Sequence, residues 1–251
     1  MQRSRLHAKA LFIALWLSIA PAGKIVGQEA SAPLPKNYQT IFENSALAVI
    51  HAHYEPHEKV PVHDHSRFAT VYVYLSDSGP VLFSHVEEHP FTALRKPVKM
   101  GAYRVSPGRI ERHSVENQGD IPTDFLRVEL KQVPVKHFSQ EYRGAAPADL
   151  SHNVDAVEFS NSDVGVERII CVAGSPCAVK ALPYSSALIA FTPTQIESGR
   201  GPAEQLEAGA VRWMEKGESL SIDADSDAPA HVLRILLPSS AAPGSNENNG
   251  R

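Results

Sequence analysis

The sequence predicts an all-β protein built from two copies of one strand-rich unit. Short runs of β-branched and aromatic residues recur between turn residues, as in sandwiches and barrels. The chain has 251 residues with 19 Pro and 15 Gly spread along it, and stretches with helical periodicity are scarce. Segments of the first half of the chain also resemble segments of the second half in the same order, which indicates an internal repeat.

Strand patterns are clearest in the first half of the chain. Each run has 5 to 8 residues and is bounded by Pro, Gly, Asp or Ser; the runs are 47–54, 69–75, 81–86, 101–105 and 125–131. Helix is expected only in short pieces near 138–142 and 202–207. The pattern therefore favours a sandwich or a barrel of short strands.

The repeat divides the chain into two units. Residues 42–75 align with 159–192 at an ungapped offset of 117, which places Phe42 on Phe159 and Asn44 on Asn161. Two further blocks match: Gly101-Ala102-Tyr103-Arg104 with Gly209-Ala210-Val211-Arg212, and Leu126-Arg127-Val128 with Leu233-Arg234-Ile235. We therefore expect domains at 36–140 and 150–238, a linker at 143–153 and a disordered tail at 239–251.

The N-terminus has the layout of a secretory signal peptide. Basic residues within 1–9 precede an apolar run at 10–20, and Pro21 ends that run. The run is shorter than the roughly 20 apolar residues that span a bilayer. We expect residues 1–27 to be removed by cleavage near 22–27, leaving a periplasmic or secreted protein without a membrane anchor.

Export bears on the two cysteines, Cys171 and Cys177. A turn sequence, 172–176, separates them and would bring two strand ends together. Under oxidising conditions they would form a hairpin disulfide, and the alternative is two small buried thiols. The spacing is not Cys-x-x-Cys, so a redox-active pair is not indicated.

Charge and motifs exclude several function classes. The chain has 24 Lys+Arg and 28 Asp+Glu, a net charge of −4, and no long basic run, so nucleic acid is not an expected partner. The sequence contains no GxSxG, P-loop, GxGxxG or HExxH motif. Serine hydrolase, nucleotide-binding and zincin functions therefore have no support.

Histidine spacing indicates a metal site. The chain has 12 histidines, and His63 and His65 are at positions i and i+2 of an expected strand. Such residues point to the same face and can reach one ion. A third imidazole, His113, follows the turn at Pro107-Gly108. Imidazole is a common ligand of zinc and other transition metals.

These motifs resemble those of the cupin superfamily. Residues 55–65, ending in His63-Asp64-His65, resemble the first cupin motif. The second cupin motif runs from a glycine through a Pro-Gly turn to H-x-x-x-N. The residues that resemble it here are Gly101, Pro107, Gly108, His113 and Asn117. Because both halves take part, the chain resembles a bicupin. The resemblance implies two tandem double-stranded β-helix, or jelly-roll, barrels.

The departures from the cupin pattern define the implied site. His57 replaces the usual turn glycine, and His113 lies one residue further from the proline than the pattern expects. Thr70 stands where a glutamate ligand is usual. The resemblance thus implies one divalent transition metal ion (Mn, Fe, Zn, Cu or Ni) on His63, His65 and His113, as in three-histidine dioxygenases.

The second copy lacks these ligands. The positions aligned with the three histidines are Lys180, Leu182 and roughly Ile222, so only the first barrel is expected to bind metal. Arg104 and Arg127 have counterparts in Arg212 and Arg234. Because the arginines persist in the copy without ligands, we expect them to serve the fold.

Other residues near the motifs are weaker candidates. Tyr72, Tyr74 and Glu111 are candidate catalytic residues, with core aromatics and a solvated turn charge as the alternatives. His51 and His53 are expected at the surface or behind the ligands. His85 and His89 are expected in an exposed loop or at the barrel mouth.

The function expected from these features is a secreted, metal-binding bicupin, a dioxygenase-like or other metal-dependent enzyme acting on a small molecule. The alternative is a non-catalytic protein that binds a small ligand or metal, or acts as a scaffold. Cupins often form dimers, so a homodimer is a further expectation from the resemblance. Sequence alone leaves the metal, the substrate and the choice between these functions open.

Overall fold

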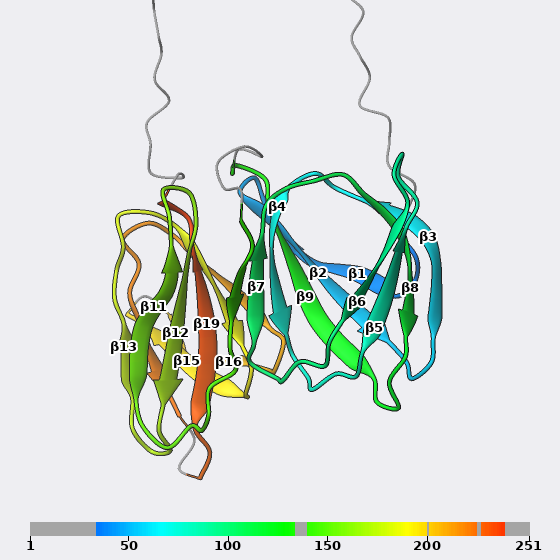
Figure 1. The fold of residues 1–251 in the computed structure, drawn as a ribbon. Helices are drawn as coiled ribbons and strands as arrows, with labels where there is room; N and C mark the ends of the chain where they lie inside the picture. Colours follow the sequence, from blue (N-terminus) through cyan, green and yellow to red (C-terminus); the bar gives the residue numbers. More distant parts are fainter. Residues whose placement is uncertain (1–33, 134–139, 200, 225–226, 239–251) are drawn as a thin grey trace, which may run out of the picture. The chain divides into compact units, whose positions relative to one another are not determined.

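Strands and connecting loops make up the described chain, which covers residues 34–133, 140–199, 201–224 and 227–238 of a computed structural model (Figure 1). These residues contain no α-helix, which confirms the predicted all-β class. The expected signal peptide and the expected tail at 239–251 lie outside the described residues. In the described part of the chain, no helix is long and apolar enough to span a membrane.

The first half forms two antiparallel sheets. Its strands are β1 (Tyr38–Glu43), β2 (Leu47–Tyr54), β3 (Lys59–His65), β4 (Ala69–Tyr74), β5 (Val81–His85), β6 (Phe91–Arg95), β7 (Tyr103–Ser106), β8 (Glu111–Asn117), β9 (Thr123–Leu130) and β10 (Tyr142–Gly144). The sheet orders are β1-β2-β9-β4-β7-β10 and β3-β8-β5-β6. In Figure 1, β8, β5 and β6 lie across from β9, β2 and β1.

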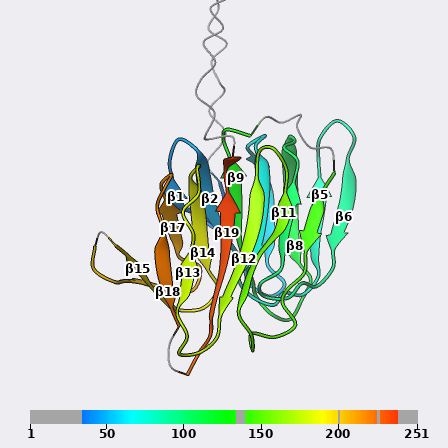
Figure 2. The same ribbon diagram turned by 90° about the vertical axis from the view of Figure 1, so that its left-hand side faces the viewer.

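The second half repeats this arrangement. Its strands are β11 (Val154–Ser160), β12 (Gly165–Cys171), β13 (Cys177–Val179), β14 (Ser186–Ala190), β15 (Thr194–Ser198), β16 (Glu204–Leu206), β17 (Val211–Met214), β18 (Leu220–Asp223) and β19 (Ala230–Leu236). The orders β11-β12-β19-β14-β17 and β13-β18-β15-β16 match those of the first half strand for strand, except that β10 has no counterpart. Figure 2 shows β12, β19 and β14 side by side.

The five predicted strand runs are confirmed as β2, β4, β5, β7 and β9, with small differences at their ends. The helix expected near 202–207 is wrong, because residues 204–206 form β16 and pair with β15. At 138–142, residues 138–139 lie outside the described residues and Tyr142 begins β10. Because β10 pairs with β7, Arg143 and Gly144, the first two residues of the expected linker, belong to a sheet. In both places strand pairing overrides weak local propensity.

The repeat extends to individual hydrogen bonds. Asn44 Oδ1 accepts hydrogen bonds from the backbone N–H groups of Ala46 and Leu47. Asn161 Oδ1 does the same for residues 163 and 164. The β1–β2 and β11–β12 pairs also carry a register shift at the same point, before Phe42 and before Phe159. The Asn turns therefore set the first hairpin of each unit.

The ungapped offset of 117 is wrong beyond the first strands. Tyr72 pairs with Arg127 in the first unit, and Leu188 pairs with Arg234 in the second, so the offset at β4 and β14 is 116. The second unit thus has one residue fewer between β12 and β14. Tyr72 therefore corresponds to Leu188, and Thr70 to Ser186.

The largest hydrophobic cluster contains residues from both units. It includes Leu47, Leu126 and Leu130 from the first unit, and Ile189 and Leu233 from the second, all fully buried. Each such side chain stabilises the fold by about 1.5–3 kcal/mol relative to an exposed one. The described residues of the two repeats accordingly form one compact unit.

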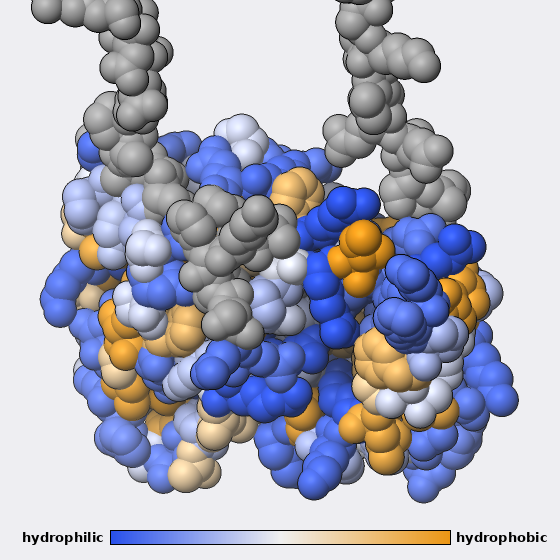
Figure 3. Space-filling view, turned by 45° about the horizontal axis from the view of Figure 1, so that its top comes forward, coloured by the Kyte–Doolittle hydropathy of each residue, from blue (hydrophilic) through white to orange (hydrophobic). Residues whose placement is uncertain are grey.

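The surface shows no concentration of one residue class on the face drawn in Figure 3, where hydrophilic residues predominate and hydrophobic ones are scattered. Phe91, Leu94 and Ile110 are among the large hydrophobic residues that are exposed. Scattered apolar residues of this kind are usual on soluble proteins.

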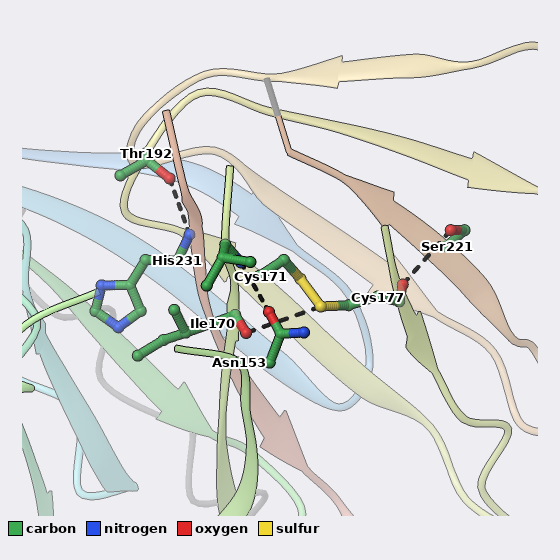
Figure 4. The surroundings of a disulfide bond; sticks show 8 residues. Asn153, Ile170, Cys171, Cys177, Thr192, Ser221 and His231 are labelled. Atoms are coloured by element: carbon green, nitrogen blue, oxygen red, sulfur yellow. Dashed lines mark hydrogen bonds between the residues drawn. A yellow bond between two sulfur atoms is a disulfide. The ribbon is translucent and has the colours of Figure 1, made fainter. Parts of the chain in front are cut away.

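A disulfide joins Cys171, the last residue of β12, to Cys177, the first residue of β13 (Figure 4). It closes the predicted turn between these strands. A cross-link over a loop this short stabilises a protein by roughly 2 kcal/mol in the chain-entropy model.

Candidate metal centre and cavity of the first barrel

The three predicted ligand histidines lie together in the first unit. His63 and His65 belong to β3, and His113 is the direct partner of His63 across the β3–β8 pair. Their ring centroids are 4.7 Å apart for His63 and His65, 4.9 Å for His63 and His113, and 5.1 Å for His65 and His113. One nitrogen of each lies within 4.8 Å of the others. These spacings allow one ion to contact all three imidazoles.

The backbone orients the first of these rings. His63 Nδ1 lies 2.8 Å from the carbonyl oxygen of Pro61, which can only accept, so Nδ1 carries the proton. The Nε2 atom of His63 therefore presents a lone pair, and it lies 3.0 Å from Nε2 of His65. A carbonyl bound to the outer nitrogen of a ligand histidine is a common feature of metal sites.

The other two rings have unsatisfied nitrogens that fit a metal ion. Both ring nitrogens of His113, and Nδ1 of His65, are buried and have no hydrogen-bond partner among the described residues. Leaving a buried polar atom unpaired costs about 1–3 kcal/mol. A transition metal accepts such nitrogen lone pairs, so the donor set fits a divalent ion.

Burial also keeps these imidazoles neutral at pH 7. It lowers the pKa of His113 to about 3 and is the largest cause of that shift. Burial, followed by the Arg127 charge, holds the pKa of His65 well below its usual value, and burial lowers the pKa of His63. Neutral imidazole is the form that binds metal, so no proton has to leave first.

A tyrosine that the sequence analysis missed contacts this cluster. The hydroxyl of Tyr38 lies 2.9 Å from His63 Nε2 and 2.6 Å from the hydroxyl of Tyr54. Burial raises the pKa of both phenols, so both are neutral. The pairing of β1 with β2 places Tyr38 opposite Ala52, and no local motif signals this.

A cavity of about 130 Å³ adjoins the histidines. Its walls are made by Tyr38, Tyr54, His65, Tyr72, Tyr74, Phe83, His85, Ala93, Leu94, Arg95, Arg104, Arg109, Glu111, His113, Phe125, Arg127 and Arg143. His65 and His113 thus face the space, and His63 is behind it. Sites for drug-sized molecules measure about 300–1,000 Å³, so this cavity suits a smaller molecule.

The three weaker candidates, Tyr72, Tyr74 and Glu111, all line this cavity. The alternative of Glu111 as a solvated turn charge is wrong, because its side chain is 5% exposed at the start of β8. Arg127 Nη1 donates to Glu111 Oε2 at 2.7 Å and to the Tyr72 hydroxyl at 2.8 Å. Burial raises the pKa of Glu111, but the Arg127 charge outweighs it and holds that pKa far below the usual value.

We expected Arg104 and Arg127 to serve the fold, and the structure also places both beside the cavity. Arg104 and Arg127 line the cavity, whereas Arg234 is bound within the second unit to Ser186, Glu167 and the carbonyl of Lys180. The same position therefore has different partners in the two units.

The remaining histidines divide between cavity, surface and turn. His85 is buried, lines the cavity and stacks on Phe91 with centroids 4.2 Å apart, while His89 is exposed. His51 and His53 are half-buried away from the cavity and share Asp124. His57 has a φ of 60°, which explains why the motif usually has glycine there.

Comparison with known proteins gives the fold its name. No protein-family model and no curated protein matches the sequence. Solved structures do match: AerE from Microcystis aeruginosa has a TM-score of 0.56 at 12% identity, over 80% of this chain and 96% of that one. An oxalate decarboxylase variant from Bacillus subtilis has a TM-score of 0.53 at 12% identity, over 80% and 72%.

A storage globulin completes the comparison. Procruciferin, an 11S globulin from Brassica napus, has a TM-score of 0.55 at 10% identity, over 78% of this chain and 76% of that one. The oxalate decarboxylase and the globulin are cupins with two barrels. This chain has the cupin fold. The predicted pair of cupin barrels is thereby confirmed, and the three-histidine cluster fits a cupin metal site.

Proposed function

We propose that the first cupin barrel holds one divalent transition metal ion through His63, His65 and His113. We also propose that the protein uses it as a metal-dependent enzyme on a small molecule in the adjoining cavity. The observation that carries this proposal is that both ring nitrogens of the buried His113 have no hydrogen-bond partner among the described residues. This ring lies beside two other neutral imidazoles, those of His63 and His65. Iron, manganese, nickel, copper and zinc all accept imidazole ligands.

The chain's own groups support chemistry at this place. A bound divalent metal would supply a Lewis acid that polarises an oxygen atom of a ligand. Arg127 holds Glu111 ionised, and the Tyr72 hydroxyl, which accepts from Arg127, points its own proton towards Glu111 Oε2 at 3.4 Å. Tyr72 is therefore a neutral donor at the cavity wall, placed to hold or release a proton. Phe83, Leu94 and Phe125 provide apolar walls that limit water.

A second candidate function is small-ligand or metal binding without turnover. Glu111 is the only carboxylate among the described residues that line the cavity. The observation that favours this candidate is that Glu111 is paired with both Arg109 and Arg127. A carboxylate held ionised by two guanidinium groups is a weak base, because its pKa lies far from neutrality. Turnover of any small molecule by the metal-loaded protein would exclude this candidate.

Export is part of the proposal. The basic and apolar layout of residues 1–20 and the disulfide between Cys171 and Cys177 both support it. Mass spectrometry of the protein from the periplasm or the medium would give its first residue. A first residue near 22–28 is expected, and an intact Met1 in the cytoplasm would contradict export.

The metal proposal is tested by elemental mass spectrometry on the purified protein. We expect about one equivalent of a divalent transition metal per chain and its loss from the His63→Ala/His65→Ala variant. Lys180→Ala/Leu182→Ala, at the positions that the sequence repeat aligns with His63 and His65, is the matched control in the second barrel and should keep the metal. Equal metal content in all three proteins, or none in the unchanged protein after incubation with each metal, would overturn the proposal.

A further inference from the structure

The cavity beside the histidines is lined by an unusual number of arginines. Five guanidinium groups and one carboxylate line it. The carboxylate is that of Glu111, and the guanidinium groups belong to Arg95, Arg104, Arg109, Arg127 and Arg143. Arginine stays protonated at all physiological pH values. The charge of this wall therefore depends on which arginines have acidic partners outside the lining.

Four of the five arginines have an acidic partner, either in the lining or outside it. Arg127 pairs with Glu111 and Glu129, and Arg109 shares Glu111. Arg104 and Arg143 share Glu141. Five guanidinium groups thus share three carboxylates, an excess of two positive charges without counting a metal ion.

Arg95 has no acidic partner among the described residues. Its Nη2 donates to the hydroxyl of Ser78 at 3.1 Å, and its Nε is buried without a partner. The guanidinium lies over the rings of Tyr74 and Phe125, at 5.1 and 5.9 Å from their centroids. Arg95 is half-buried, and a partly buried charge without an acidic partner is costly to keep, so ligand binding is one reason for a protein to keep it.

A second guanidinium is available beside Arg95. Arg104 binds Glu141 through Nη1, lies 4.0 Å over the Tyr72 ring, and has a buried Nε without a partner. Arg95 and Arg104 each keep one N–H group, at Nε, without a partner in the described chain. Both residues line the cavity, so an anion there would meet two guanidinium groups that are not fully paired.

The remaining lining selects among anions. Guanidinium forms paired hydrogen bonds with planar carboxylates and also with phosphate. Phe83, Ala93, Leu94 and Phe125 give one side of the cavity an apolar surface, which suits a carbon skeleton better than an inorganic ion. The volume of about 130 Å³ limits that skeleton to a small one.

We infer that the ligand of the first barrel is a small organic carboxylate, with its carboxylate bound by Arg95 and Arg104 and the rest of the molecule directed to His65 and His113. This inference deepens the proposed function and rests on it for the role of the metal, but its carboxylate part depends on the arginines alone. Arg95 and Arg104 are then specificity-determining residues.

Isothermal titration calorimetry on the metal-loaded protein tests this. The probes are pyruvate, malonate and benzoate, with the primary amides of malonate and benzoate as uncharged controls and inorganic phosphate as a competing anion. The variants are Arg95→Gln, Arg95→Lys and Arg104→Gln. Arg67→Gln is the matched control, because it removes the same charge from an exposed residue of the same barrel that does not line the cavity.

We expect at least one acid to bind about tenfold or more tightly than its amide, and Arg95→Gln to weaken that binding by about 10- to 100-fold. Arg95→Lys should lose less, Arg104→Gln should weaken binding, and Arg67→Gln should change Kd by less than about twofold. Acids that bind no better than amides, phosphate that binds as tightly as the acids, or an Arg95→Gln variant with unchanged Kd would overturn the inference. If Arg95→Gln does not fold, Arg95→Lys and Arg104→Gln still decide it.

Metal content separates this inference from the proposed function. Arg95→Gln should keep its metal while losing carboxylate affinity. Loss of carboxylate binding with metal retained in every arginine variant would leave the function proposal intact. Carboxylate binding by a protein that never takes up metal would support the arginine assignment and overturn the metal proposal.

Discussion

The two barrels share their backbone and differ in what fills them. Gly101 and Gly209 have φ values of 87° and 83°, and the N–H of each bonds to the carbonyl at the end of the corresponding strand, Tyr74 or Ala190. Inside, the first barrel has histidines, tyrosines and arginines around a cavity. The second barrel buries an apolar cluster that includes Val179, Leu188, Met214, Leu220 and Ile222.

This difference separates residues that build a barrel from residues that give it chemistry. Turn glycines and the Asn turns recur in both units because backbone geometry requires them. Interior side chains are free to vary as long as volume is filled, so the second barrel can have apolar packing where the first has polar groups. The arginine pair shows both cases: Arg234 binds groups of its own unit, and Arg127 borders the cavity.

The largest expected effect is on metal binding. Replacing His113 with Ala should lower metal affinity by about 100-fold or more, because the buried ring provides one of three ligands. The Ile222→Ala variant alters the corresponding strand of the second barrel and should keep its metal. Elemental analysis after dialysis measures the metal content of both variants. Metal loss from both would show that metal binding in the first barrel depends on the second barrel.

The next largest expected effect is the loss of stability when the buried ion pairs of the first barrel are broken. Arg127→Met leaves the buried Glu129 without this arginine and leaves Glu111 with Arg109 alone, which should lower the free energy of unfolding by about 3–5 kcal/mol. Arg234→Met leaves only Glu167 without its arginine, so a smaller loss is expected. Urea unfolding of both variants gives the comparison, and equal losses would contradict it.

The filled barrel should be more sensitive to loss of volume. Ile222 is fully buried, so Ile222→Ala should lower the free energy of unfolding by about 2–5 kcal/mol. Phe83→Ala enlarges a cavity that already exists, so its cost should be at the low end for a Phe truncation. Thermal and urea unfolding would check the order, and a larger loss for Phe83→Ala would reverse our interpretation of the two interiors.

Acid stability should depend on Glu111. Its folded pKa lies below that of the unfolded chain, so its contribution to stability is present above about pH 4.3 and is lost as the pH falls below that value. Glu111→Gln should therefore flatten the loss of stability between about pH 5 and pH 3. Urea midpoints across this range measure the slope. An unchanged slope would show that Glu111 is not held ionised.

The smallest expected effect is on the pKa of His53, which forms a second His-x-His pair with His51 in the first barrel. A hydrogen bond to Asp124 is the largest cause that raises the pKa of His53, so Asp124→Asn should lower that pKa. Because the folded pKa is raised, this pair stabilises the protein below about pH 6.5 and loses its effect as the pH rises through the folded value. NMR titration of the ring protons measures it. Asp149→Asn, beside exposed His152, should leave His53 unchanged.

Local patterns were sufficient for five strands of the first unit and, together with the motif that contains His113, for the three-histidine cluster. Alternating β-branched residues between turn residues predict strands without knowledge of their partners, and i, i+2 spacing puts His63 and His65 on one face. Those patterns did not show the one-residue change of offset at β14, because it appears only when Leu188 is seen opposite Arg234.

The sequence by itself determined the all-β class, the repeat and the residue types that can bind a metal, because each can be recognised from the residues along the chain. Only the tertiary structure decided that Tyr38 contacts His63, that Glu111 is buried against Arg127, and that Arg95 lacks an acidic partner in the described chain. The physical reason is that these contacts join strands through pairings distant in sequence, and burial and charge balance follow from those pairings.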